Sequence, residues 1–371
     1  MPLLSAEIDK ILVEHTNFQD VLTQVQFVVE TASHRAVRRP CIPVIGHSGA
    51  GKTTVIDNIR AEFPIVENGR EVRLPDGATA MCDHVPVLCV EMPSKVAVGR
   101  IARLILRTLG DPRWNKGKTD DLDYRVDTLL RACGTVCVLV DEAQRVVDRA
   151  GVLTAEGVID WFKERHAANP IAFLMFGMPR MRMLFDQDSQ FKRRWDSEID
   201  LAPYDWGEDE DNDVSDRLNF MGLLAAFRNE CPIMFADEVD VEDDDVAKRF
   251  YYASRGLAGG LHKLFEMTCR IVDERAWRAR RVGEAPAPAV IDMGLLEAAY
   301  DRAFRPRTSH ERLINPFSRT EWDGRLPPPL PDDNTVTHEA KRRRRMARTS
   351  TGRPSTRSER KRAVDAALSK R

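Results

Sequence analysis

The sequence predicts an α/β fold: a three-layer sandwich with a parallel five-stranded sheet between two layers of helices, followed by a C-terminal helical lid. Three observations support this prediction. Short β-branched and apolar runs alternate with amphipathic helical stretches between residues 40 and 206. A glycine-rich loop joins the first of these runs to the next helical stretch. After an acidic linker at residues 207–213, four helical stretches follow.

The chain begins with apolar residues at helical spacing, so residues 1–39 are expected to form an N-terminal helical segment. Residues 40–206 form the predicted core. Residues Glu71–Ala78 predict a small hairpin within it, because Asp76 and Gly77 supply turn residues between extended ones. The five strands of the sheet are expected at Cys41–Ile45, Val85–Glu91, Val136–Val140, Ile171–Phe176 and Glu198–Leu201.

The lid is expected over residues 207–303, and residues 304–337 form an irregular linker with a stiff polyproline run. The final segment, residues 338–371, holds thirteen Lys or Arg residues against three acidic ones and few apolar residues, so a basic, disordered tail is expected. The lid helices are expected at Leu218–Phe227, Asp244–Arg255, Leu261–Arg280 and Ile291–Ala303.

The composition is that of an ordinary globular protein, with 43% hydrophobic and 31% charged residues and a formal net charge of -2. The charge is unevenly divided, since a basic tail follows an acidic body, and this suggests a polyanionic or acidic partner. Seven cysteines form no Cys-x-x-Cys pair, so reduced thiols are expected. The chain shows neither a membrane-span pattern nor a signal-peptide pattern, so a cytoplasmic protein without a membrane partner is expected.

The glycine-rich loop has the spacing Gly-x-x-x-x-Gly-Lys-Thr, directly after a predicted strand and at the start of a predicted helix. Glycines let the backbone wrap closely around phosphate, and successive N–H groups with the positive helix end stabilise the anion. Lys52 is expected to reach the β- and γ-phosphates of ATP, Thr53 to bind Mg²⁺, and Thr54 to contact a nearby phosphate oxygen. The predicted nucleotide-binding residues are Gly46, His47, Ser48, Gly49, Ala50, Gly51, Lys52, Thr53 and Thr54.

Two carboxylates end the third predicted strand, at the sheet edge where open α/β sheets bind ligands. Asp141 is expected to hold Mg²⁺ through its water shell. Glu142, the next residue, is expected to polarise the attacking water as a general base. An apolar strand followed by Asp-Glu is also a common strand end, but its position about 90 residues after the glycine-rich loop favours a catalytic pair with ATP and Mg²⁺ as cofactors.

Together these residues resemble the TniB/TnsC-type transposition ATPases, which are AAA+ regulators related to the phage target-selection protein MuB. The resemblance covers about residues 15–320. Its most specific parts are Asp-Glu-Ala-Gln at 141–144 and a Gln-aromatic-x-x-Arg-aromatic spacing at 190–195. The matching segments are Gly46–Thr54, Leu139–Gln144, Lys163–Asn169, Gln190–Trp195 with Asp205 and Trp206, and Asn315–Phe317.

The resemblance implies an AAA+ ATPase that forms a homo-oligomer, as a ring or a helical filament, on duplex DNA in an ATP-dependent way. Such an ATPase links a target-selector protein, of the TniQ type, to a DDE-type transposase, and hydrolysis disassembles the oligomer. The basic tail could then bind DNA, fold into a groove on the transposase, or remain solvated.

The resemblance also assigns roles to single residues. Arg194 occupies the place of the trans-acting arginine finger, just before the fifth strand, with Arg193 as the alternative; a surface basic cluster would explain both. Lys263, after the glycine-rich run at residues 256–260, occupies the place of a second nucleotide sensor, although a glycine-rich helix start explains the run equally well. Met178 departs from the family, which places a small polar residue there, so hydrolysis is expected to be slow or atypical.

DNA contacts in such oligomers come from positive side chains that line the bore, and the basic residues after the second strand are the expected source. Phosphate contacts of this kind are independent of sequence and sensitive to salt. A solvated helix face explains the same charges. The predicted DNA-binding residues are Lys95, Arg100, Arg103, Lys116 and Lys118.

The sequence therefore predicts an ATPase that assembles on target DNA and links target selection to a transposase. Two alternatives share the nucleotide site. One is a loader of the initiator or helicase-loader kind. The other is an ATP-gated DNA-binding scaffold with little hydrolysis, which Met178 suggests.

Overall fold

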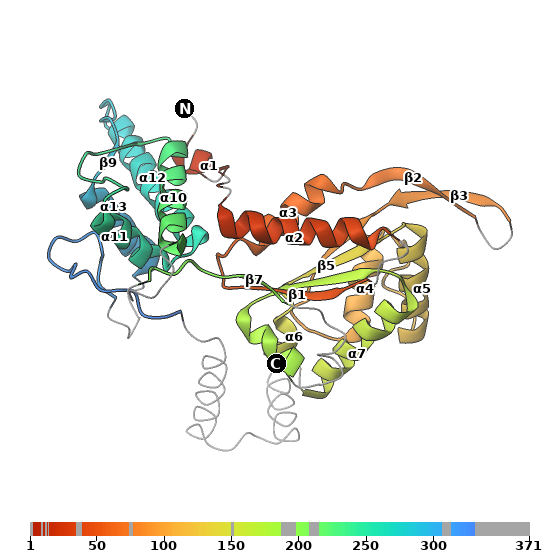
Figure 1. The fold of residues 1–371 in the computed structure, drawn as a ribbon. Helices are drawn as coiled ribbons and strands as arrows, with labels where there is room; N and C mark the ends of the chain where they lie inside the picture. Colours follow the sequence, from red (N-terminus) through yellow and green to blue (C-terminus); the bar gives the residue numbers. More distant parts are fainter. Residues whose placement is uncertain are drawn as a thin grey trace, which may run out of the picture. The chain divides into compact units, whose positions relative to one another are not determined.

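The computed structural model describes residues 3–8, 10–11, 13, 15–34, 39–73, 77–149, 152–186, 198–207, 215–305 and 313–330 (Figure 1). At its centre is one parallel sheet in the order β4-β5-β6-β1-β7. This confirms the predicted parallel five-stranded sheet, and each strand ends within two residues of its expected bounds. The strands are β1 (Cys41–Gly46), β4 (Val87–Glu91), β5 (Cys137–Asp141), β6 (Ala172–Gly177) and β7 (Ile199–Leu201).

Helices cover both faces of this sheet, which explains why its central strands are apolar at nearly every position. Along β5, Val138 and Val140 pack with α4, α5 and α7 on one face, whereas Cys137 and Leu139 pack with α2 and α3 on the other. The three-layer prediction is therefore confirmed. The helices of this part are α2 (Thr16–Ala32), α3 (Lys52–Glu62), α4 (Val98–Thr108), α5 (Thr119–Ala132), α6 (Arg145–Arg149), α7 (Val152–Ala168), the 3₁₀ helix η1 (Pro179–Met181) and α8 (Arg182–Asp186).

The N-terminal segment is divided between two cores rather than forming one helical unit. Helix α1 (Leu4–Ile8) packs against α12 of the lid, where the carboxylate of Asp273 accepts hydrogen bonds from the backbone N–H groups of Leu4 and Ser5 and from the Ser5 hydroxyl, at 2.8–3.1 Å. Ile8 is buried in the lid core. Helix α2 packs on the sheet instead. The chain between them breaks the helix because the two halves bury their apolar residues in different places.

The predicted hairpin is present and longer than expected. Strand β2 (Val66–Arg73) pairs antiparallel with β3 (Thr79–His84). The base of the hairpin is attached to the end of α5, because the Cys82 thiol donates to the Ala132 carbonyl at 3.3 Å and a His84 ring nitrogen lies 3.1 Å from the Cys133 carbonyl.

The lid contains the four predicted helices and a short parallel pair of strands, β8 (Met234–Phe235) and β9 (Val290–Ile291). Its core is rich in aromatic rings, with Phe250 stacked on Phe265 at 5.8 Å and Phe317 edge-on to Phe250 at 5.1 Å. The helices are α10 (Ser215–Glu230), α11 (Asp244–Ser254), α12 (Ala258–Arg281) and α13 (Met293–Phe304).

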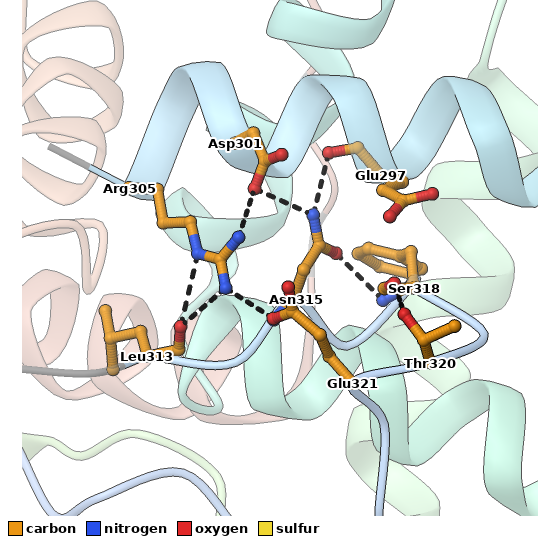
Figure 2. A network of polar contacts seen from close by, with 9 residues as sticks. Glu297, Asp301, Arg305, Leu313, Asn315, Ser318, Thr320 and Glu321 are labelled. Carbon is orange, nitrogen blue, oxygen red and sulfur yellow. Dashed lines mark hydrogen bonds and ion pairs between the residues drawn. The ribbon is translucent and has the colours of Figure 1, made fainter. Parts of the chain in front are cut away.

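Residues 313–330, which we term the C-terminal strap, contain no helix or strand but are not a free spacer. Asn315 is 1% exposed, and its side-chain amide donates to the Glu297 carbonyl and the Asp301 carboxylate, both at 2.9 Å (Figure 2). Its amide oxygen accepts the Phe317 N–H at 3.0 Å. Arg305 joins the same network through Asp301, Leu313 and Glu321. The strap therefore belongs to the lid core and extends it beyond the predicted boundary at 303.

Among the helices in the described ranges, none combines the length and the hydropathy that crossing a lipid bilayer requires. The predicted tail, residues 338–371, lies outside the described residues.

Candidate nucleotide-binding site

The glycine-rich loop runs from the end of β1 to the start of α3, and its glycines have identifiable steric reasons. Gly49 and Gly51 have φ angles of 82° and 104°, in the left-handed region that favours glycine. A Cβ on Gly46 would lie 3.0 Å from the Leu201 carbonyl oxygen of β7. The predicted phosphate loop therefore has the tight backbone turn that its glycines allow. It leads directly into the N-terminus of α3, where N–H groups and the helix dipole attract anions.

Lys52 is the first residue of α3 and is only 8% exposed. Its ammonium donates to the carbonyl oxygens of Gly46 at 2.7 Å and His47 at 2.8 Å. These bonds hold the charge inside the loop, where phosphate groups would lie. Among the nine predicted nucleotide-binding residues of the loop, Gly46 and His47 use their carbonyls to orient the Lys52 ammonium. Ala50 is buried in the core beneath the loop.

Asp141 and Glu142 follow β5 at the same edge of the sheet. Burial raises the pKa of Asp141, while the backbone N–H of Glu142, which donates to Asp141 Oδ1 at 2.7 Å, and nearby Lys52 oppose that rise. Glu142 has a φ of 56°, a left-handed conformation that few non-glycine residues adopt. Such conformations persist where the surroundings impose them and are frequent at functional sites.

The residues predicted to hold Mg²⁺ fit that ion chemically. Thr53 is exposed in the first turn of α3, and Asp141 ends the strand two places from β1 in the sheet. A hydroxyl and a carboxylate are oxygen donors of the kind Mg²⁺ prefers. The half-buried carboxylate of Asp141, whose pKa is raised by desolvation, would be stabilised by a cation beside it. Bound with ATP, Mg²⁺ would neutralise phosphate charge.

A cavity of about 470 Å³ opens above the loop, within the size range of small-molecule and cofactor sites. One wall is Ser48, Gly49 and Gly51–Thr54 with Glu142 and Met178. The N-terminal segment, including Ile11, forms a second wall, and the lid forms a third. The residues that these two walls contribute are Lys10, Ile11, Val13, His15, Phe18, Phe227, Ala258, Gly259 and His262.

The lid touches the glycine-rich loop directly. The backbone N–H of Gly259 donates to the Gly49 carbonyl at 2.9 Å, and a Cβ on Gly259 would lie 2.5 Å from that oxygen. The glycine run at 256–260 therefore permits close approach of two backbones. Lys263 is not brought to the cavity: it is exposed, and its ammonium lies 4.7 Å from the centre of the Phe304 ring. His262 lines the cavity in its place.

His15 is a site residue that no sequence motif signalled. It precedes α2, and its Nδ1 lies 2.9 Å from the Tyr204 hydroxyl. Burial lowers the pKa of His15 to about 4. A lone histidine between two helical stretches carries no local signal, and only the packing of α1 on the lid and α2 on the sheet places it beside the loop.

Two of the segments that carry predicted DNA-binding residues, the start of α4 with Arg100 and Arg103 and the loop with Lys116 and Lys118, are joined by a hydrogen bond. Arg103 in α4 donates to the carbonyls of Gly99 at 3.0 Å and Gly117 at 3.4 Å, so it ties the loop at 110–118 to the start of α4. Arg103 is half-buried, and the other four, Lys95, Arg100, Lys116 and Lys118, are exposed. The predicted finger, Arg194, and its alternative Arg193 lie outside the described residues.

A parallel sheet in this order, with a phosphate loop after β1, an Asp-Glu pair after β5 and a helical lid on the loop, defines the fold of a P-loop ATPase of the AAA+ class. The model of the bacterial TniB protein family matches residues 6–204, more than half of the chain. The chain therefore belongs to the TniB family.

Solved structures of the same fold include two archaeal proteins. The Aeropyrum pernix ORC1 protein in complex with DNA is 13% identical with a TM-score of 0.52, and the match covers 78% of this chain and 66% of that one. CDC6P from Pyrobaculum aerophilum is 13% identical with a TM-score of 0.51, over 81% of this chain and 71% of that one. At this identity the likeness shows the fold alone. No curated protein matches the chain.

Proposed function

We propose that this protein is an ATPase that assembles on target duplex DNA when it binds ATP and links a target-selector protein to a DDE-type transposase. The observation that carries the proposal is the cavity shared by the phosphate loop, Glu142 and the lid, in a chain of the TniB family. Nucleotide bound in this cavity would contact the phosphate loop, the N-terminal segment and the lid at once. Assembly on DNA would then depend on ATP, because ATP would fix these three parts relative to one another.

The two ends of the cavity suit the two ends of ATP. Lys52 and the α3 N-terminus would receive the phosphates, with Thr53 as a ligand of Mg²⁺ and Asp141 holding the ion through its water shell. The opposite walls carry apolar side chains, Ile11 and Phe227 among them, which would accept the adenine ring. Lys263, which lies outside this cavity, would contact nucleotide only after a movement of the lid.

Glu142 would activate the water that hydrolyses ATP. Water oxygen attacks the γ-phosphorus, the bond from that phosphorus to the ADP oxygen breaks, and the water proton passes to the Glu142 carboxylate. Arg194 of a neighbouring subunit would neutralise charge on the transferring group, so that hydrolysis depends on assembly. Removing the carboxylate should therefore stop turnover without preventing ATP binding.

The exposed cations at the start of α4 and in the loop at 110–118 would contact DNA phosphates. Each contact adds about 0.9 to the slope of log Kd against log salt. The paired variant Lys95→Glu/Arg100→Glu should therefore lower that slope by about 2 in fluorescence anisotropy with a duplex. Arg60→Glu/Arg228→Glu, which changes exposed arginines on α3 and α10, is the matched control. An unchanged slope in the first variant would remove these residues from the DNA interface.

The central experiment combines nucleotide binding, hydrolysis and electron microscopy of the protein with duplex DNA. Lys52→Ala should weaken ATP binding by at least about 100-fold and abolish DNA loading. Glu142→Gln should bind ATP but hydrolyse it at least about 100-fold more slowly and remain as oligomers on DNA. Normal turnover by Glu142→Gln would contradict the role of Glu142. Oligomers that load a helicase but leave transposition unchanged would favour an initiator-type role instead.

One observation favours a second function, an ATP-gated scaffold with little hydrolysis. Met178 lines the cavity beside Glu142, where a polar side chain would help to orient water. Phosphate release measured with and without duplex DNA separates the two functions. A scaffold would stay bound to DNA with ATP and release no phosphate above the rate of Glu142→Gln.

A further inference from the structure

The carboxylate of Glu142 is held from one side only. The Gln144 side-chain amide donates to Oε2 at 3.1 Å, and Nη2 of Arg145 forms an ion pair with the same oxygen at 3.2 Å. No described residue donates a hydrogen bond to Oε1. Since Glu142 lines the nucleotide cavity, this arrangement leaves one carboxylate oxygen available to a water molecule there.

Gln144 is fixed at both ends. It is 2% exposed, and its amide oxygen accepts the backbone N–H of Met178 at 3.2 Å. The amide can satisfy both neighbours in only one orientation, because Met178 offers a donor and Glu142 an acceptor. Gly177 makes room for it: a Cβ there would lie 3.1 Å from the Gln144 amide oxygen and 2.7 Å from Met181 Sδ.

Arg145 is fixed by the neighbouring strand. Its Nη1 forms an ion pair with Glu91 Oε1 at 2.7 Å and donates to the Met92 carbonyl at 2.5 Å, both at the end of β4. The guanidinium thus spans from β4 to the residue after β5. Because the guanidinium is planar and rigid, fixing Nη1 also fixes Nη2 beside Glu142, and a lysine ammonium could not make both contacts in this geometry.

The side chain of Met178 forms its hydrogen bond with Arg180, not with Glu142. Its sulfur accepts a hydrogen bond from Nη1 of Arg180 at 3.0 Å, and Arg180 is paired with Asp148 at 2.7 Å and 2.8 Å. The thioether therefore lines the cavity as a fixed, weakly polar surface and gives Glu142 no support. The polar contact in this region comes from Gln144, which reaches the backbone of residue 178 from the β5 side.

We propose that Gln144 and Arg145 are the positioning residues of the general base: together they hold Glu142 by Oε2, so that Oε1 faces the attacking water. Gln144 thereby supplies the polar contact that Met178 lacks. The inference rests on the proposed role of Glu142 in ATP hydrolysis and extends it to two residues that do not touch the substrate.

The test separates turnover from binding. Gln144→Met and Arg145→Met should each lower the rate constant of ATP hydrolysis in single-turnover assays, and kcat with it, by about 10- to 100-fold, because misplacing a reacting group by about 1 Å costs up to that much. Affinity for a fluorescent ATP analogue should stay within about twofold of wild type, since neither residue lines the cavity. Arg145→Lys should recover only part of the loss.

Gln144→Glu distinguishes positioning from a purely structural role. The new carboxyl can still accept the Met178 N–H, but it brings a second acidic group to Glu142 Oε2, where two ionised carboxylates repel and a shared proton would disable the base. Positioning therefore predicts a loss of kcat larger than the loss of folded protein in urea denaturation explains, whereas a structural role predicts kcat in proportion to the folded fraction. Thr268→Val in the lid is the control, because it removes a buried hydroxyl that bonds only the Leu264 carbonyl and should leave kcat unchanged. Arg145→Met, at a partly exposed site, keeps the test usable if Gln144 variants fold poorly.

Two outcomes must be told apart. If Glu142→Gln retains normal turnover, the proposed role of Glu142 fails. If Glu142→Gln is inactive while Gln144→Met and Arg145→Met keep wild-type kcat, Glu142 is the base but needs no positioning by these residues, and the inference is overturned. Loss of ATP affinity in parallel with kcat would also overturn it, because the residues would then act on the fold of the site.

Discussion

The contact between the lid and the phosphate loop gives the sharpest test of how this site is built. Gly259 lies in the first turn of α12, and its backbone meets the backbone of Gly49. In Gly259→Ala the new Cβ would lie 2.5 Å from the Gly49 carbonyl oxygen, 2.8 Å from its Cα and 3.0 Å from its carbonyl carbon. All three atoms are backbone, so no side-chain rotation relieves the overlap, and the lid must move away from the loop.

The expected cost follows from three contributions. Overpacking of this kind costs about 1–3 kcal/mol. Loss of the hydrogen bond to Gly49 costs about 0.5–1.5 kcal/mol. Alanine regains up to about 1 kcal/mol over glycine through helix propensity. The net destabilisation should therefore be about 1–3 kcal/mol, and because both glycines line the cavity, affinity for a fluorescent ATP analogue should fall by about 10-fold, or about 1.4 kcal/mol.

Urea denaturation and nucleotide titration measure both effects, and Gly222→Ala is the matched control. Gly222 lies within α10, where a Cβ would meet no other heavy atom within 4 Å, so the same substitution should stabilise the protein by about 0.5–1 kcal/mol. If Gly259→Ala were as stable as Gly222→Ala and bound nucleotide normally, the lid would not rest on the loop as the contact implies, and the reasoning would be refuted.

Two further predictions concern stability. Asn315→Ala removes the buried amide that joins the strap to α13 and leaves the Phe317 N–H without its acceptor, so urea denaturation should show a loss of stability of about 2–4 kcal/mol. The control Thr108→Ala, at an exposed site, should lose less than about 0.5 kcal/mol. Equal losses would contradict a structural role for the strap. Burial lowers the pKa of His15 from 6.5 to about 4, so the unfolded chain binds a proton there first as pH falls, and up to about 3 kcal/mol of stability should be lost between pH 6.5 and 4. His15→Asn should show a shallower pH dependence than wild type over that range, and identical slopes would contradict this assignment.

Much of the fold could be predicted because its signals are local. Each sheet strand is a short apolar run, and helices on both faces bury nearly every residue of it, so strand bounds were predictable to within two residues. The phosphate loop was predictable because Gly49 and Gly51 need a left-handed backbone that glycine adopts most easily. Asp141 and Glu142 were predictable because carboxylates after a buried strand lie at the ligand-binding edge.

Other features depend on which segments meet in space, and no local pattern encodes that. The helical spacing of residues 1–39 is real, but only packing shows that α1 joins the lid while α2 joins the sheet, which places His15 in the nucleotide cavity. The resemblance placed a nucleotide sensor at Lys263, with a plain glycine-rich helix start as the alternative explanation of the run at 256–260. In the folded chain that run serves a backbone contact between Gly259 and Gly49 instead.

By itself, the sequence determined the layered α/β fold, the phosphate loop and the carboxylate pair, because each depends on residues that are neighbours along the chain. Only the tertiary structure decided how Glu142 is held, since Gln144 meets Met178 across the gap between β5 and β6, and Arg145 meets Glu91 across the gap between β5 and β4. Such contacts depend on the order of strands in the sheet, and strand order is set by the packing of the whole domain.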